Sequence, residues 1–178
     1  MNKIRKTSLF FFMIGIIACA MTGCLDNIQS DYTPRILMSD LYINPYYIND
    51  TVLHAQDTMH IRYNTKSEKY LSDTMLLGDT VMFGVAFDAQ GNNLVSTQIE
   101  WDTTNVQAWF GINDAIKKAL SDTTNLHSGN LSYVPGYGVA SFPVYLVPKK
   151  AGSHTIKLTV ATDSKYSPVS ESFDLVVE

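Results

Sequence analysis

The sequence has few of the residues that bind a fold together covalently or through metal. Of its 178 residues only two are cysteines, Cys19 and Cys24, and both lie close to the N-terminus. That placement excludes a disulfide scaffold and a cysteine-based zinc site in the rest of the chain. Basic residues are also scarce, with 13 Lys and Arg against 17 Asp and Glu. A net charge of −4 argues against a nucleic-acid partner, because phosphate backbones are bound by an excess of positive charge.

Motifs of catalysis and of cofactor binding are missing from the sequence. There is no G-x-S-x-G, no P-loop and no G-x-G-x-x-G, so neither a nucleophilic serine nor a phosphate-binding loop is indicated. The four histidines, His54, His60, His127 and His154, form neither H-E-x-x-H nor H-x-H pairs. We therefore predict no catalytic residue, no metal site and no cofactor. The protein is predicted not to be an enzyme, and an enzyme with an unrecognised site is the third of three functional hypotheses.

The first 23 residues have the pattern of a secretory signal peptide. Lys3, Arg5 and Lys6 precede an uncharged run of 13 residues, Leu9–Met21. A membrane-spanning helix needs about 20 apolar residues, so this run is too short to span a bilayer. We expect residues 1–23 to be removed from the mature protein.

The run ends in Met21-Thr22-Gly23-Cys24, which resembles the lipobox of bacterial lipoproteins. The resemblance implies that Cys24 becomes the first mature residue and carries lipid, which would anchor the protein to a membrane. The alternative is an ordinary signal peptide with an incidental cysteine. Leu25 stands where an Asp would favour inner-membrane retention, so the resemblance implies an outer-membrane lipoprotein of the cell envelope, on its periplasmic face or the cell surface. Residues 24–35 are expected to form a flexible tether.

From about residue 36 onward, apolar and polar residues alternate with a period of two, which indicates half-buried strands. Strands with one apolar face are typical of antiparallel sheets that pack face to face. We predict an all-β antiparallel sandwich of about seven to nine strands over residues 36–178. Nine side chains are predicted to be buried: Phe83, Val85, Ile99, Trp101, Ile156, Leu158, Val160, Phe173 and Leu175.

Turn residues and a proline give two finer expectations. Gln90-Gly91-Asn92-Asn93 has turn chemistry and lies between the alternating segments 80–87 and 95–101, which predicts a hairpin. Pro143 cannot donate a backbone hydrogen bond, so the strand over 139–147 is predicted to lie at a sheet edge.

Two short segments resemble bacterial Ig-like and PKD-like domains. Ala151–Val160 is similar to their A-G-x-Y-x-[VI]-x-L-x-V segment, with His154 where those families usually have Tyr. Ile99–Asp102 is similar to their apolar-x-Trp-Asp segment, although Thr103-Thr104 replaces the glycine-aspartate motif that follows in PKD domains. The resemblance covers about residues 80–178 and implies an Ig-like sandwich. The whole chain resembles uncharacterised Bacteroidota lipoproteins that carry such a domain.

Residues 102–131 form a long excursion between two predicted strands. Within it Ile112, Ile116 and Leu120 are spaced by four, which predicts one short helix. Four aromatic residues in or beside the excursion are the candidate ligand contacts: Trp109, Phe110, Tyr133 and Tyr137.

Exposed aromatic faces on loops stack on sugar rings or anchor a partner protein, and long loops in compact domains are often functional. Trp109 and Phe110 are neighbours, so on an extended chain they cannot both face inward. The alternative is that the excursion packs a small core of its own under the helix.

These features together predict a non-catalytic binding or adhesion module of the cell envelope, with a glycan or an envelope protein as partner. The alternative is a structural accessory subunit of an envelope or pilus-like assembly. An exposed planar row of aromatic side chains would favour the binding module. A large apolar patch or an open edge strand would favour the accessory subunit.

Overall fold

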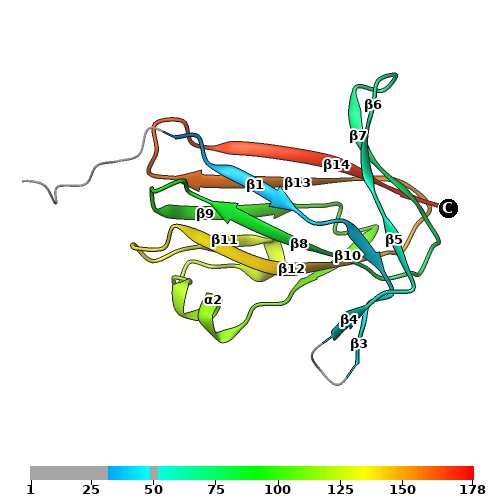
Figure 1. Ribbon diagram of the computed structural model, residues 1–178, viewed down its shortest axis with the longest axis horizontal. Coiled ribbons are helices and arrows are strands. Elements are labelled where there is room, and N and C mark those ends of the chain that lie inside the picture. Colours follow the sequence, from blue (N-terminus) through cyan, green and yellow to red (C-terminus); the bar gives the residue numbers. More distant parts are fainter. Residues whose placement is uncertain (1–31, 49–51) are drawn as a thin grey trace, which may run out of the picture.

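The computed structural model describes residues 32–48 and 52–178, most of which belong to two six-stranded sheets packed face to face (Figure 1). The predicted all-β sandwich is therefore confirmed. The signal peptide predicted for residues 1–23 and the lipid attachment predicted at Cys24 lie outside the described residues.

One sheet is named here the β8 sheet after its central strand. Its strands, in spatial order, are β10 (Val106–Phe110), β12 (Val139–Pro148), β8 (Val81–Asp88), β2 (Leu41–Ile43) and β5 (Asp57–Met59). A further strand, β1 (Arg35–Met38), pairs with β8 in line with β2. The pairs of this sheet are antiparallel.

The second sheet is named the β13 sheet. Its strands, in spatial order, are β11 (Asn130–Ser132), β9 (Leu94–Glu100), β13 (Gly152–Thr162), β14 (Val169–Val177), β7 (Lys69–Met75) and β6 (Ile61–Asn64). The β7–β14 pair is parallel, whereas the other pairs of this sheet are antiparallel.

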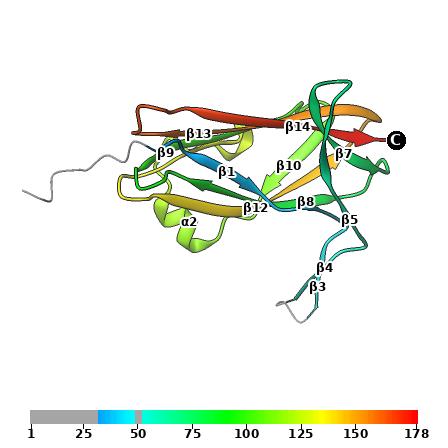
Figure 2. The same ribbon diagram turned by 45° about the horizontal axis from the view of Figure 1, so that its top comes forward.

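Three smaller elements lie outside the two sheets. A ribbon of β3 (Tyr46–Ile48) and β4 (Val52–His54) extends away from the sandwich (Figure 2). The helix α2 (Asp114–Ala119) and the short 3₁₀ helix η1 (Leu126–Ser128) lie between β10 and β11 in the chain.

The described residues form fourteen strands, more than the seven to nine predicted. The extra strands are short ones in the first third of the chain, where β1–β6 have three or four residues each. Such lengths hold too few residues for an alternating pattern to emerge from the sequence.

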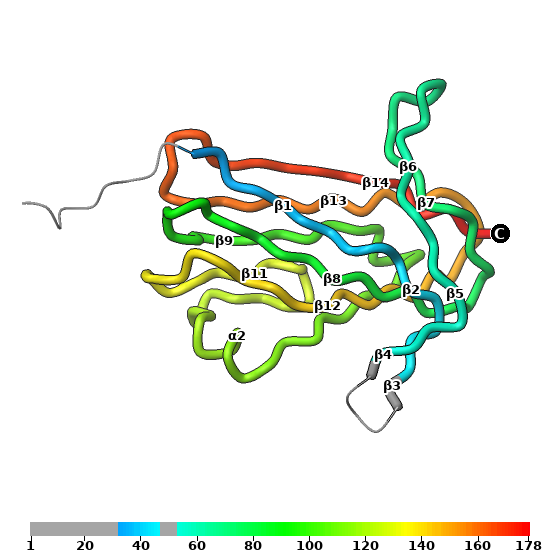
Figure 3. The backbone as a smooth tube through the Cα atoms, viewed as in Figure 1, coloured from blue at the N-terminus to red at the C-terminus, as the bar shows by residue number. Residues whose placement is uncertain are grey.

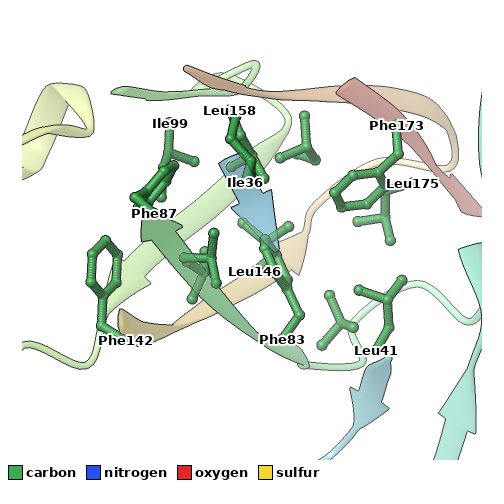
Figure 4. Close-up of a cluster of buried hydrophobic side chains, with 14 of the residues drawn as sticks. Ile36, Leu41, Phe83, Phe87, Ile99, Phe142, Leu146, Leu158, Phe173 and Leu175 are labelled. Carbon is green, nitrogen blue, oxygen red and sulfur yellow. The ribbon is translucent and has the colours of Figure 1, made fainter. Parts of the chain in front are cut away.

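Core side chains from the two sheets meet in one apolar layer (Figure 4). Phe83 of β8 and Phe173 of β14 link the sheets edge to face, with ring centroids 5.7 Å apart. Eight of the nine side chains predicted to be buried are buried. The ninth, Trp101, is half-buried against this core because it lies just beyond the end of β9.

The hairpin predicted over segments 80–87 and 95–101 is wrong. β8 belongs to one sheet and β9 to the other, so the loop between them crosses the sandwich. A two-residue period shows that one face of a strand is apolar, but it does not show to which of the two sheets the strand belongs. Turn residues alone therefore could not separate a hairpin from a crossing between sheets.

The edge position predicted from Pro143 is also wrong, because β12 pairs with β10 on one side and with β8 on the other. The carbonyl of Pro143 accepts the N–H of Gly111 at 2.9 Å. In an antiparallel strand the N–H and C=O positions of a residue face the same neighbour. The missing N–H of Pro143 therefore faces the point just past Phe110 where β10 ends, so no ladder bond of β10 is lost.

Candidate functional site

The four candidate ligand-contact residues do not gather on one surface. Tyr133 is buried, and its hydroxyl shares a 2.9 Å hydrogen bond with Thr97 Oγ1. Phe110 and Tyr137 are half-buried and pack against the core. Trp109 is the one member of the four with a large free surface, at 41% exposure.

The hydroxyl of Tyr133 serves the packing of the core and not ligand binding. Burial raises the pKa of its hydroxyl to about 12, an effect that the hydrogen bond with Thr97 opposes only in part. A phenol that stays neutral at every physiological pH and donates or accepts within the core offers nothing to an outside ligand.

The excursion 102–131 packs as an extension of the main core. Its predicted helix is α2, and Asn113 Oδ1 caps it by accepting the backbone N–H of Ile116 at 2.9 Å. Ile112, Ile116 and Leu120 are half-buried against the core that the two sheets share. The excursion also supplies two edge strands, β10 to the β8 sheet and β11 to the β13 sheet.

Trp109 stacks on Tyr145 on the outer face of the β8 sheet. The two residues lie opposite each other in the β10–β12 register, with ring centroids 5.2 Å apart and ring planes 2° from parallel. Phe110 points to the other face, where its ring meets Trp101 and Phe142 edge to face. The alternation of β10 thus turns one aromatic ring outward and its neighbour inward.

The stacked pair begins a row of large side chains that crosses four strands. Tyr145 lies opposite Met82 of β8, and Met82 lies opposite Tyr42 of β2. Neighbouring strands are about 4.8 Å apart, so the row is about 14 Å long. Tyr145 and Tyr42 are half-buried and Met82 is 4% exposed. Trp109, Tyr145, Met82 and Tyr42 are called the outer row below.

Sequence reasoning missed Tyr145, Met82 and Tyr42. Each alternates with buried neighbours along its strand, a signal that places it on the outer face. Their alignment with Trp109 depends on strand order and register, which the local pattern does not contain.

Beside the outer row the side chains of the sheet are small. Gly111, Pro143 and Gly84 lie side by side across the sheet, and Ser39 Oγ accepts the N–H of Gly84 at 2.8 Å. A Cβ atom on Gly111 would lie 2.5 Å from Pro143 Cγ, so only glycine fits at that position. The result is a low strip of surface along one side of the rings.

A groove of about 570 Å³ lies on another side of the sandwich, where β1, the β6–β7 hairpin and β14 come together. The turn end of this hairpin projects beyond the rest of the sandwich (Figure 3). The groove is lined by Met38, Ser39, Asp40, Ile61, Tyr70, Ser170, Glu171 and Ser172.

An ion pair ties β7 to β14 next to the turn of the same hairpin. Lys69 Nζ lies 3.2 Å from Asp174 Oδ2, and Thr155 Oγ1 donates to Asp174 Oδ1 at 2.6 Å. Burial raises the pKa of Asp174, but the hydrogen bonds from Thr155 and Lys69 outweigh burial and hold that pKa below its usual value.

Two further features were sought over residues 32–48 and 52–178. Within these ranges no three His, Cys, Asp or Glu side chains are grouped closely enough to hold a metal ion. The same ranges contain no helix with the length and apolar character needed to cross a bilayer.

No family model and no curated protein matches the chain. Among solved structures it is similar to a family 123 glycoside hydrolase from Clostridium perfringens, with a TM-score of 0.42, 10% identity, and coverage of 83% of this chain and 27% of that one. It is similar to the C-terminal domain of the Streptococcus pyogenes antigen I/II-family protein AspA, with a TM-score of 0.42, 13% identity, and coverage of 70% and 48%. It is also similar to a protein described as BspA_C_mut, with a TM-score of 0.44, 12% identity, and coverage of 81% and 47%.

The chain spans about half or less of the length of each of these three proteins. The sandwich fold is established by the two sheets themselves, and none of these likenesses assigns a function.

Proposed function

We propose that this protein is a non-catalytic binding module of the bacterial cell envelope that recognises a glycan chain on the outer face of the β8 sheet. The observation that carries the proposal is the stacked Trp109–Tyr145 pair, with its rings 2° from parallel and Trp109 41% exposed. It is the kind of exposed, planar aromatic surface that favours a binding module over a structural subunit.

The chemistry of the outer row suits a neutral, extended ligand. Aromatic faces pack against the C–H faces of sugar rings and gain from apolar area without needing a charge. The row spans about 14 Å, but Met82 within it is buried, so the ring surface open to a ligand lies on the Trp109–Tyr145 pair, with a further half-buried ring at Tyr42. Beside the rings, the Pro143 ring packs over Gly111 and the small Ser39 side chain lies next to Gly84, so the groups that border the rings are small.

Membrane attachment belongs to the same proposal and is supported by the sequence. The signal-peptide pattern and the Met21–Cys24 segment support a lipid on Cys24 and an outer-membrane location. Cys24→Ala is expected to release the protein from membranes or to leave it unprocessed. Fractionation of cell envelopes and gel mobility would measure this, and unchanged partitioning with unchanged mobility would contradict it.

Glycan recognition is tested with the full-length protein in detergent micelles on an array of plant, host and bacterial-wall polysaccharides. We expect binding to one class, and we expect Trp109→Ala to weaken it at least about tenfold, which corresponds to about 1.4 kcal/mol. The matched control is Tyr63→Ala, which removes a comparably exposed aromatic ring elsewhere and should leave binding unchanged.

Two outcomes would contradict glycan recognition: no glycan bound by the wild type, or equal losses in Trp109→Ala and Tyr63→Ala. The second candidate function is the accessory subunit of an envelope or pilus-like assembly. It is favoured by an open strand edge: β14 pairs with β13 from Val169 to Val177, but with β7 only from Asp174 onward.

A further inference from the structure

The groove beside β14 is bounded by strand edges of both sheets. β14 pairs with β13 along its whole length but with β7 only from Asp174 onward. Within the described part of the chain, no strand covers the other edge of β14 between Val169 and Phe173. Across the groove, β1 pairs with β8 on one side, and Ile61 and Tyr70 of the β6–β7 hairpin line the groove.

The backbone groups along that edge point into the groove. The N–H of Val176 donates to Ser72 Oγ on β7, so it faces the β7 edge and not β13. Strand β14 keeps an unbroken register with β13, and the side to which N–H groups point alternates every residue. The N–H and C=O groups of Ser172 and Ser170 therefore face the same edge, where the groove is open.

A carboxylate projects into the groove from the core-facing side of β14. Glu171 shares the face of Phe173 and Leu175, both of which are buried, yet Glu171 is exposed. Within the described residues, the Glu171 carboxylate has no hydrogen bond or ion pair, whereas its backbone pairs with Leu158 of β13. Asp40 lines the groove as well, and its Oδ1 lies 3.1 Å from His60 Nδ1.

The lining of the groove contains two carboxylates and no Lys or Arg side chain. A strand laid against Ser170 and Ser172 would place alternate side chains into the gap at Glu171. An apolar side chain there would leave a carboxylate facing hydrocarbon, whereas a cationic one would pair with it.

We propose that this groove binds an extended peptide by strand addition to β14, with a Lys or Arg side chain of the peptide paired to Glu171. The peptide backbone bonds to Ser170 and Ser172, and the charge of Glu171 selects the side chain that enters. This inference is independent of glycan binding, because the outer row and the groove share no residue.

The test uses the full-length protein in detergent micelles and two capped seven-residue peptides, one alternating threonine with lysine and one alternating threonine with glutamate. NMR titration follows the backbone amides. We expect the lysine peptide to shift the Ser170 and Ser172 amides and to slow their hydrogen exchange, and the glutamate peptide to do neither.

Charge reversal sharpens the test. Glu171→Lys is expected to weaken binding of the lysine peptide at least tenfold and to create binding of the glutamate peptide. Asp122→Lys is the matched control, since it makes the same change in net charge at an exposed turn between α2 and η1, outside the groove lining, and should behave as the wild type. Ser172→Pro removes one N–H from the open edge and is expected to abolish binding of either peptide.

Three results would overturn the proposal. The first is that correctly folded protein binds the two peptides equally well or binds neither. The second is that the Glu171→Lys variant still prefers the lysine peptide to the glutamate peptide. The third is that Glu171→Val turns a monomeric protein into a dimer while the wild type binds no peptide. Glu171 would then serve to prevent edge-to-edge pairing between copies of the protein and not to recognise a peptide.

Discussion

Two cross-strand aromatic pairs on this molecule share a register and a spacing but differ in geometry. Trp109 and Tyr145 on β10–β12, like Tyr63 and Tyr70 on β6–β7, lie opposite each other with ring centroids 5.2 Å apart. The first pair is stacked at 2°, whereas the second meets at 62°. Pairing in the sheet therefore sets the distance between two rings, but not the plane that they form.

The difference lies in what supports each pair from below. Under the first pair, Phe110 reaches into the core and contacts two other aromatic rings. The second pair stands on a hairpin where Ile61 alone among the β6 side chains packs against the core as a partly buried hydrophobic residue. A flat binding surface needs a packed layer beneath it, which the β6–β7 hairpin does not have.

The largest expected effect comes from removing that layer. Phe110→Ala should cost about 3 kcal/mol of unfolding free energy and disorder the Trp109–Tyr145 stack, because it empties space beneath β10. Ile61→Ala, the matched change under the other pair, should cost about 1 kcal/mol. Urea unfolding of both variants measures the difference, and equal costs would show that the two pairs are supported alike.

The next effect concerns the hydrogen bond that holds the far end of the excursion. Tyr133→Phe should cost about 1–2 kcal/mol, because Thr97 Oγ1 is buried and loses its partner. The raised pKa of Tyr133, about 12 when folded, means that the unfolded chain ionises first. Its contribution is therefore complete below about pH 10 and is lost as the pH rises toward 12.

Thermal melts of wild type and Tyr133→Phe between pH 8 and 11 measure this difference. The gap between the two proteins should shrink above about pH 10. A constant gap across that range would count against the buried phenol as its cause.

A smaller effect is expected at the ion pair between β7 and β14. Asp174→Asn should cost about 1 kcal/mol at neutral pH, since it weakens the bonds from Thr155 and Lys69. The folded pKa of Asp174 lies below its unfolded value, so its contribution is present above about pH 4 and lost as the pH falls further. Melting temperatures from pH 7 to pH 3 should therefore fall less steeply in the variant, and parallel curves would argue against the shift.

The smallest effect separates folding from binding. Trp109→Ala and Tyr63→Ala should each change the unfolding free energy by only about 0.5 kcal/mol, because each side chain is about half exposed and belongs to one aromatic pair. Circular dichroism melts of the two variants provide the check. A loss of several kcal/mol in Trp109→Ala alone would make its ring structural.

The sequence allowed the core to be predicted wherever a strand is long. Phe83, Val85, Ile156 and Leu158 alternate over enough residues to fix the inward face, and all four are buried. β1–β6 are too short for that signal, so the first third of the chain could not be divided into strands.

The candidate site was harder to predict because it depends on register. Trp109 was identified from its place in the excursion, but its partner Tyr145 comes from a strand about 35 residues later in the chain. Tyr133 lies near the same turn residues as Tyr137, yet its hydroxyl pairs within the core, which composition does not reveal. The predictions made from Pro143 and from the 90–93 turn were wrong for the same reason, because strand order decides which strands lie beside each of them.

The attachment of β1 gives the molecule a mechanical polarity. Arg35 begins β1 at one end of the sandwich, and the C-terminus lies at the other end (Figure 1). A force that draws on the chain at Arg35 acts along β1 and shears its four paired residues against β8 together, so that none opens before the others. β8 is held to β12 over eight residues, so the shorter β1 ladder is expected to yield first, while the core and the outer row stay intact. Under tension the sandwich would lengthen by releasing β1 before it loses the surface that carries Trp109.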